Sequence, residues 1–353
     1  MVLKHRWFTA LLLAALLTFG LAACAGKSKD GIIIYPSPPE EPRVVYLTSY
    51  QGFDAFRERS FLDVIFGDPV EAKLMKPWGV FARDGKIYAT DTGTALVMIF
   101  DTVGKTVRTV GTGGTGSLAL PLGVAMGSNG ILYVSDGRLK KVFGFDAEGK
   151  LKFGIGQPGE LQNPTGIAIN DELGRMYIAD SYGHVIRVYS LAGEKLFDFG
   201  IRGEKDGQFN YPTNVCVNRT NGQVYVTDTQ NFRVQVFDKD GVFVRKIGQL
   251  GDVPGTFSRP KVLAVDSEDH LYVTDAAFNN VQLFDKDGQL LLIFGGFGTG
   301  PGELQLPAGM HIDDQDKIYI VDQVGGRVLV FQYLSEKWKA ANPQDYETYK
   351  LKP

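Results

Sequence analysis

Six copies of one short pattern run along this chain of 353 residues, spaced 44 to 48 residues apart. Each copy has a tyrosine three residues before an aspartate and a Phe or Tyr nine residues after that aspartate, and a proline stands 11 to 13 residues before each tyrosine. The six aspartates are Asp91, Asp136, Asp180, Asp228, Asp275 and Asp322. Agreement at every landmark predicts a fold that repeats one structural unit.

Each unit has the pattern of four short strands. In the fourth copy, strand-like segments at residues 215–217, 223–227, 233–237 and 242–247 are separated by the turn signals Asn221–Gly222 and Asp240–Gly241. Four-stranded meanders that recur at this spacing are typical of propeller blades, and a ring of blades buries both faces of every sheet. The sequence therefore predicts an all-β, six-bladed β-propeller of four-stranded antiparallel blades.

The sixth unit supplies three strands, which end at Phe331. Residues 43–49 have an alternating strand-like pattern, and we expect them to close the ring beside residues 327–331 because an unpaired edge exposes backbone donors and acceptors. Apolar residues spaced over 54–66 predict a short amphipathic helix. The predicted divisions are a closing strand and helix at 43–74, the propeller at 75–334 and a polar tail at 335–353.

The N-terminus has the features of a bacterial lipoprotein leader. Lys4, His5 and Arg6 precede an uncharged apolar run over residues 7–23, which predicts a signal peptide at 1–23. The sequence at 21–24, Leu-Ala-Ala-Cys, resembles a lipobox and implies acylation of Cys24; the alternative is a plain signal peptide that happens to contain a cysteine. Residues 24–42 are proline-rich, which favours an extended stalk.

These features predict an extracytoplasmic protein held to a membrane by lipid. Ala25, rather than an aspartate, follows Cys24 and favours the outer membrane, facing the periplasm. The second of the two cysteines, Cys216, is expected to be a buried apolar residue, so no disulfide forms within the chain if Cys24 carries lipid.

The repeat resembles a known family. Tyr211–Pro212, the run 225–229, the run 233–238 and the glycine-rich connection 295–307 are similar to the NHL repeat, and the resemblance covers about residues 75–331. It implies a six-bladed propeller. It does not imply one function, because NHL propellers include protein-binding modules, RNA-binding modules, extracellular sensor domains and some metal-dependent enzymes.

Catalysis is the second of two functional readings. The six repeated aspartates occur in every unit, and we expect them to accept hydrogen bonds from backbone N–H groups of the loop that follows. A metal-dependent lyase or lactonase-like enzyme needs several ligands on the propeller axis, where the predicted innermost strands offer Asn214 and His311. No catalytic residue, metal site or cofactor is therefore predicted.

Charge separates the two faces of the predicted ring. The net charge of −3 argues against a nucleic-acid partner. The first-to-second and third-to-fourth turns sum to −11, whereas the second-to-third loops and the connections between blades sum to +3, or −3 with the six aspartates included. The less acidic face is the predicted working surface.

Aromatic and basic residues on that face are the candidate binding residues. We predict a recognition or scaffolding propeller with a protein, peptide or glycan partner, and its oligomeric state is left open. A competing interpretation is that the aromatic rings pack over the blades and the basic groups offset nearby aspartates. The candidates are Trp78, Arg138, Lys140 with Lys141, Tyr182, His184, Phe232, Arg233, and Phe278 with Asn279.

Overall fold

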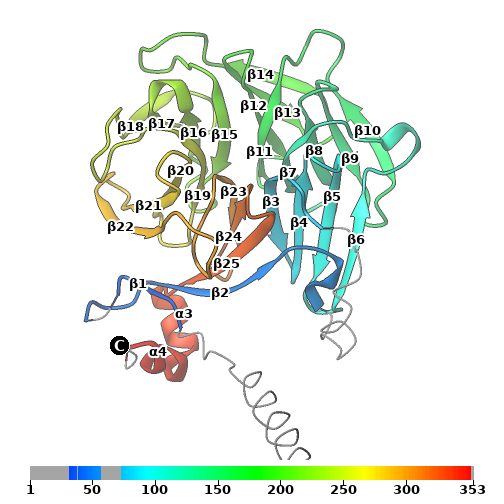
Figure 1. Cartoon of the computed structure of the whole chain (residues 1–353). Coiled ribbons are helices and arrows are strands. Elements are labelled where there is room, and N and C mark those ends of the chain that lie inside the picture. The colour runs from blue at the N-terminus through cyan, green and yellow to red at the C-terminus, as the bar shows by residue number, and fades with distance from the viewer. Residues whose placement is uncertain (1–31, 38, 57–72, 351–353) are drawn as a thin grey trace, which may run out of the picture. The chain divides into compact units, whose positions relative to one another are not determined.

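The computed structural model describes residues 32–37, 39–56 and 73–350. Six antiparallel sheets surround a common axis, with the first strand of each sheet innermost (Figure 1). This confirms the predicted propeller. The predicted signal peptide, Cys24 and residues 57–66 of the predicted helix lie outside the described residues. Within the ranges described, no helix is long and apolar enough to cross a membrane.

Five blades have four strands each, in chain order from the axis to the rim. The first blade contains β3 (Pro77–Arg83), β4 (Lys86–Asp91), β5 (Leu96–Asp101) and β6 (Thr106–Val110). The second contains β7 (Pro121–Met126), β8 (Leu132–Asp136), β9 (Lys141–Phe145) and β10 (Leu151–Ile155). The third contains β11 (Pro164–Asn170), β12 (Arg175–Asp180), β13 (Val185–Ser190) and β14 (Lys195–Phe199).

The fourth and fifth blades repeat this order. The fourth contains β15 (Pro212–Val217), β16 (Val224–Asp228), β17 (Arg233–Phe237) and β18 (Phe243–Ile247). The fifth contains β19 (Pro260–Val265), β20 (Leu271–Asp275), β21 (Asn280–Phe284) and β22 (Leu290–Gly295). Short 3-10 turns η3 (Gly114–Gly116) and η4 (Thr229–Asn231) lie in the connections.

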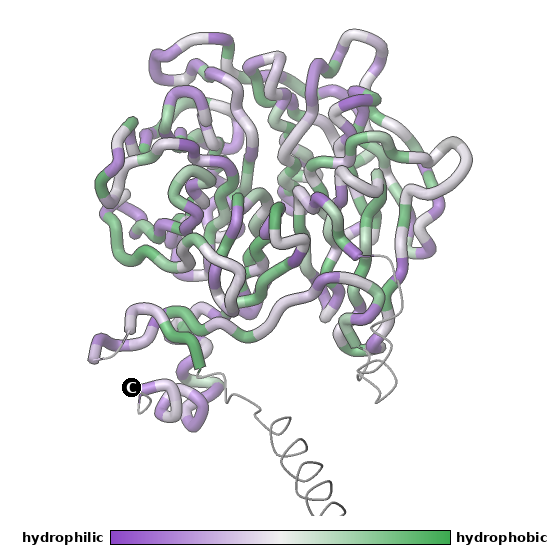
Figure 2. The backbone as a smooth tube through the Cα atoms, viewed as in Figure 1, coloured by the Kyte–Doolittle hydropathy of each residue, from purple (hydrophilic) through white to green (hydrophobic). Residues whose placement is uncertain are grey.

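Burial along the strands follows from their place in the ring. Every residue of β8, β16 and β20 is buried, because both faces of a blade pack against neighbouring blades. The outer strands β6, β10 and β18 instead alternate between more exposed and more buried residues at the rim. Figure 2 shows apolar stretches along the strands and hydrophilic stretches in many loops.

The sixth blade is completed by the N-terminal segment. It contains β23 (Pro307–Ile312), β24 (Lys317–Asp322) and β25 (Arg327–Tyr333), and β2 (Val44–Tyr50) pairs antiparallel with β25. The predicted closing strand is confirmed. Val44 lies opposite Tyr333 and is fully buried in the core between the fifth and sixth blades.

A fifth strand extends this sheet further than the sequence predicts. β1 (Ile34–Tyr35) pairs antiparallel with β2, and the Ile34 side chain is buried. The last part of the segment expected to be a stalk, residues 24–42, therefore packs against the sixth blade instead of extending from it. After β2, residues Phe53–Phe56 form the 3-10 turn η2, at the start of the predicted amphipathic helix.

The polar tail is helical. It forms α3 (Glu336–Ala341) and α4 (Pro343–Lys350), and the Ser335 hydroxyl caps α3 by accepting a hydrogen bond from the Trp338 N–H at 3.2 Å. Tyr346 and Leu334 join Ile34 and Val45 in a small apolar cluster. The two ends of the described chain are thus packed together (Figure 1).

The repeated aspartates hold loops in place, and all but Asp180, which bonds to the entering connection and to Arg187, also bond to the loop that follows. All six side chains are fully buried. In the second blade, Asp136 Oδ1 accepts hydrogen bonds from the N–H groups of Arg138 and Leu139 in the following loop, as the sequence predicts. Its Oδ2 accepts bonds from Ala119 and Leu120 in the connection that enters the blade, which the sequence did not indicate. The carboxylate therefore ties each blade to the connection from its neighbour.

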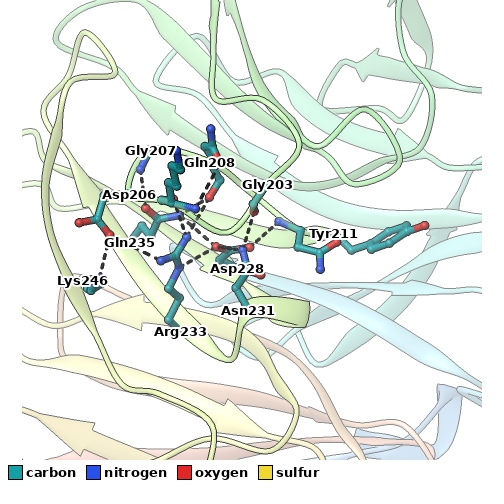
Figure 3. Close-up of polar contacts among 12 residues, drawn as sticks. Gly203, Asp206, Gly207, Gln208, Tyr211, Asp228, Asn231, Arg233, Gln235 and Lys246 are labelled. Carbon is teal, nitrogen blue, oxygen red and sulfur yellow. Dashed lines mark hydrogen bonds and ion pairs between the residues drawn. The ribbon is translucent and has the colours of Figure 1, made fainter.

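In the fourth blade, side chains as well as backbone groups donate hydrogen bonds to the repeated aspartate (Figure 3). Asp228 Oδ1 accepts a bond from the Asn210 N–H, and its Oδ2 accepts bonds from Asn231, Arg233 and Gln235. Burial nevertheless raises the pKa of Asp228 above its ordinary value, more than these donors lower it. The Arg233 guanidinium also donates to the carbonyl oxygens of Lys205 and Gln208, at 2.8 and 3.1 Å.

Ring closure can be tested by shortening one buried side chain of β2. We expect Val44→Ala to lower the free energy of unfolding by about 2 kcal/mol, because it leaves a cavity between β2 and the fifth and sixth blades. Leu47→Ala is the control, since Leu47 is exposed on the same strand, and its effect should stay within about 0.5 kcal/mol. Urea titration followed by circular dichroism measures both, and equal losses contradict β2 as the closing strand.

The aspartate clamp has a nearly isosteric test. Asp136→Asn keeps one acceptor oxygen but turns an NH₂ group toward one pair of backbone N–H donors, so at least two buried donors lose their acceptor. We expect a loss of about 3 kcal/mol in the free energy of unfolding. Glu148→Gln, at an exposed site of the same blade, should change it by less than about 0.5 kcal/mol. If both variants unfold at the same urea concentration, the clamp is not a major source of stability.

Candidate functional site

A channel of about 380 Å³ runs along the propeller axis. It is lined by all six innermost strands, which begin on the face formed by the second-to-third loops and the connections between blades, here called the loop face. The opposite face, formed by the first-to-second and third-to-fourth turns, is here called the turn face. The volume lies in the range of small-molecule pockets.

Glycines keep the channel narrow where neighbouring strands approach each other. A Cβ at Gly123 would overlap the Thr165 carbonyl oxygen, and a Cβ at Gly309 would overlap the Trp78 carbonyl oxygen. The corresponding positions in the fourth and fifth blades hold Asn214 and Val262. At β15 and β19, side chains therefore stand where glycine allows close contact between backbones in the other four blades.

The mouth of the channel on the loop face contains a lysine stacked on a tryptophan. Lys261 of β19 places Nζ 4.1 Å from the centroid of the Trp78 ring of β3. Both side chains are half-buried. Burial lowers the pKa of Lys261 to about 8, with further lowering by the charges of Arg259 and Lys76. The candidate Trp78 thus lies at the channel, beside a lysine that the sequence analysis did not single out.

Ion pairs link blades across the axis at the turn-face end. Arg83 of the first blade lies 3.8 Å from Asp171 of the third, and Arg219 of the fourth pairs with Asp314 of the sixth. Arg219 also donates a hydrogen bond to the Ile312 carbonyl oxygen at 2.7 Å. The two ends of the channel therefore differ, because paired charges bridge one end and a stacked cation lies at the other.

His311 lies in the channel wall as a neutral imidazole. Burial, together with the nearby positive charges of Arg219 and Arg83, lowers its pKa to about 3. Its Nε2 lies 3.0 Å from the Ala82 carbonyl oxygen and must carry the proton in this hydrogen bond, since a carbonyl only accepts. The ring centroid is 4.4 Å from that of Phe81. His311 is thus held in place by the first blade.

The channel offers little for metal or nucleophilic chemistry. Among residues 32–37, 39–56 and 73–350, no three His, Cys, Asp or Glu side chains are grouped as metal ligands. Asn214 reaches the neighbouring strand instead, where its Oδ1 accepts a 3.4 Å hydrogen bond from the Leu263 N–H. Cys216 also lines the channel, and burial raises the pKa of its thiol, which disfavours a reactive thiolate.

The predicted binding residues of the third blade divide into exposed and buried members. Tyr182 is 65% exposed and contacts Tyr211 edge-on, with ring centroids 6.0 Å apart. His184 is buried, and its Nδ1 accepts a 3.2 Å hydrogen bond from the Tyr211 N–H. His184 therefore positions Tyr211, and the two tyrosines are the side chains that face solvent.

The remaining candidates are distributed around the same face. Arg138 and Lys140, together with Lys141, are exposed on the second blade. Phe232 is half-buried and packs against the core between the fourth and fifth blades, and Phe278 is half-buried on the fifth. Arg233 is buried within the network of Figure 3, so it is engaged inside the blade rather than presented on the loop face.

Exposed large apolar side chains are more numerous on the loop face than on the turn face. Of the 17 large apolar side chains that are exposed within the described ranges, nine lie on the loop face and three on the turn face. Phe297 is 73% exposed, and Leu250 occupies the equivalent position one blade earlier. The nine are Met75, Leu139, Tyr182, Ile201, Tyr211, Leu250, Val253, Phe297 and Val324.

The sequence analysis placed its candidates on the face where most of these exposed side chains lie, but it did not name several of the residues. The connections between blades repeat with the same spacing, so Leu250 and Phe297 could have been compared by aligning the units. The stacking of Lys261 on Trp78 had no such signal, because residues of the first and fifth blades meet only across the axis.

Comparisons with known proteins agree with this architecture. The model of the NHL repeat matches residues 209–237, and a model described as a 6-bladed beta-propeller matches residues 261–350. A search of curated proteins finds no match.

Solved structures show the same fold at low identity. A Bacteroides thetaiotaomicron protein of unknown function is 18% identical, with 75% of this chain and 71% of that chain covered and a TM-score of 0.59. An auxiliary nutrient binding protein from Bacteroides ovatus is 14% identical, with 73% and 69% covered and a TM-score of 0.56. A virginiamycin B lyase from Staphylococcus aureus is 10% identical, with 81% and 98% covered and a TM-score of 0.54. The chain is thus a six-bladed β-propeller in which one unit matches the NHL repeat and the last part of the ring matches the 6-bladed beta-propeller model.

Proposed function

We propose that this propeller is a recognition protein, anchored by lipid on Cys24 to the bacterial cell envelope outside the cytoplasm, which binds a protein partner through its loop face. The main support for this proposal is that more large apolar side chains are exposed on that face than on the turn face. Solvent-exposed apolar clusters lose contact with water when a partner covers them, and such clusters mark interaction sites.

The kind of exposed residue favours a protein over a glycan as the partner. Leu250, Val253 and Ile201 are aliphatic and offer no hydrogen bonds, whereas sugars present hydroxyl groups at nearly every position. Aliphatic and aromatic side chains surrounded by charged groups such as Arg138 and Lys140 are typical of protein interfaces. The turn face is more acidic and carries three exposed large apolar side chains, against nine on the loop face.

The structural neighbours include both binding proteins and a lyase. These correspond to the two functions considered from the sequence, a recognition propeller and an enzyme with an axial site. The auxiliary nutrient binding proteins of Bacteroides support a binding role for this fold. An axial enzyme of the lyase kind is the alternative, and the neutral, hydrogen-bonded His311 does not favour it. Metal analysis of the purified chain distinguishes the two, since a stoichiometric cation supports the enzyme.

The binding face can be tested by site-specific photo-crosslinking in intact cells. A photoreactive side chain at Phe297 should yield one discrete protein adduct, because this position is exposed at the proposed interface. The control is the same side chain at Val103, which is exposed on a third-to-fourth turn of the turn face. A discrete adduct at Val103 with none at Phe297 would mean that the partner binds the turn face, which contradicts the proposal.

Anchoring depends on one residue. Cys24→Ser should move the chain from the membrane fraction to the soluble fraction, because several acyl chains, at about 0.8 kcal/mol per buried CH₂ group, are needed for stable attachment. Cys216→Ser is the matched control and should leave fractionation unchanged. Mass spectrometry of the mature N-terminus gives an independent measurement, and an unmodified Cys24 contradicts lipid anchoring.

A further inference from the structure

One cationic side chain, that of Lys261, lines the channel at its loop-face end, and the exposed side chains of Arg259 and Lys76 lie outside the lining. Lys261 follows Pro260 at the start of β19, Arg259 precedes that proline, and Lys76 precedes Pro77 at the start of β3. The positive charges of Arg259 and Lys76 contribute to the lowered pKa of Lys261. Among the residues that the structure describes, none of the three forms an ion pair.

The repeated aspartates of the first and fifth blades form no ion pair with Lys261. Asp91 and Asp275 are fully buried, and they accept hydrogen bonds from the backbone N–H groups of Lys76 and Arg259. Burying a charged ammonium beside two like charges is unfavourable unless an anion compensates it. The aromatic ring of Trp78 supplies a weaker attraction than a negative charge at the same place would.

We propose that the loop-face mouth of the axial channel binds a small ligand that carries a carboxylate or phosphate group, with Lys261 as the central contact and Arg259 and Lys76 beside it. The body of the ligand lies against Trp78 and extends into the channel, where Thr213 and Asn214 supply polar groups. The channel volume suits a small molecule. At the far end of the channel, ion pairs join the first blade to the third and the fourth to the sixth.

This inference rests on the proposed function in that the mouth opens on the recognition face, but it concerns a different ligand. A small anion binds without the protein partner. Loss of anion binding therefore leaves partner crosslinking at Phe297 unaffected, and failure of that crosslinking leaves anion binding unaffected.

Protonation of Lys261 gives the site a characteristic pH dependence. An anion binds the charged ammonium, and the pKa of about 8 means that the free protein loses this charge at moderately alkaline pH. Affinity should be full about one pH unit below this pKa and should fall up to tenfold per pH unit above it. Between pH 8 and 9.5, binding should take up protons, because a bound anion raises the pKa of the lysine.

The experiment is isothermal titration calorimetry of the full-length chain with citrate and with inorganic phosphate, and with glucose as an uncharged probe. We expect at least one of the two anions to bind and glucose not to bind. Lys261→Met should weaken binding at least tenfold. Lys261→Arg should restore it and remove the decline above pH 8, because arginine stays protonated. Repeating titrations in buffers of different ionisation enthalpy measures proton uptake.

Lys286→Met is the matched control, because Lys286 is exposed on the turn face of the same fifth blade. It should bind as the unaltered chain does. The proposal is overturned if neither anion binds, if Lys286→Met weakens binding as much as Lys261→Met, or if Lys261→Arg keeps the decline above pH 8. Thermal melting of each variant shows whether the ring remains folded, and the Lys261→Arg result decides the case if Lys261→Met unfolds.

Discussion

The buried aspartate of each blade is the interaction on which this ring depends. A propeller has no single core, because its apolar clusters lie between successive blades, and the connections that cross the loop face must be held without regular pairing of their own. A carboxylate accepts several bonds at once, so Asp136 holds backbone from the entering connection and from the following loop. Asp228 bonds to the backbone of the entering connection at Asn210 and to the following loop through the Asn231 side chain, with further bonds from Arg233 and Gln235. Loops secured in this way can carry exposed side chains without loss of order.

Closure of the ring sets a second constraint, which joins the two ends of the chain. β2 and β25 leave no unpaired edge between the sixth blade and the N-terminal segment, and β1 with the two terminal helices extends this junction outward. A lipid on Cys24 would therefore attach close in sequence to the closing strand. The loop face and the channel mouth are formed by other parts of the ring, so anchoring and recognition need not compete for the same residues.

The channel shows how departures from the repeat create a site. Glycine at the third position of the innermost strand allows close approach in four blades, while Asn214 and Val262 replace it in the others. Lys261 and Trp78 each occur in one blade, and the ring brings them together. His311 departs from the repeat in the same way, but its bond to Ala82 and its lowered pKa make it a fixed part of the wall. The proposed anion site therefore uses Lys261, which forms no ion pair within the described residues, rather than His311.

The amino-acid sequence alone determined the number of blades, the four-strand unit, the closing strand and the less acidic face, because each follows from spacing, alternation or charge within one unit. It also located Trp78 and Tyr182 on that face. Tertiary structure decided that Arg233 and His184 are buried, that β1 shortens the predicted stalk and that the tail forms two helices. It alone revealed the stacking of Lys261 on Trp78. The physical reason is that hydrogen-bond partners and neighbours across the axis come from distant blades, and no local pattern records which side chains the closed ring brings within reach.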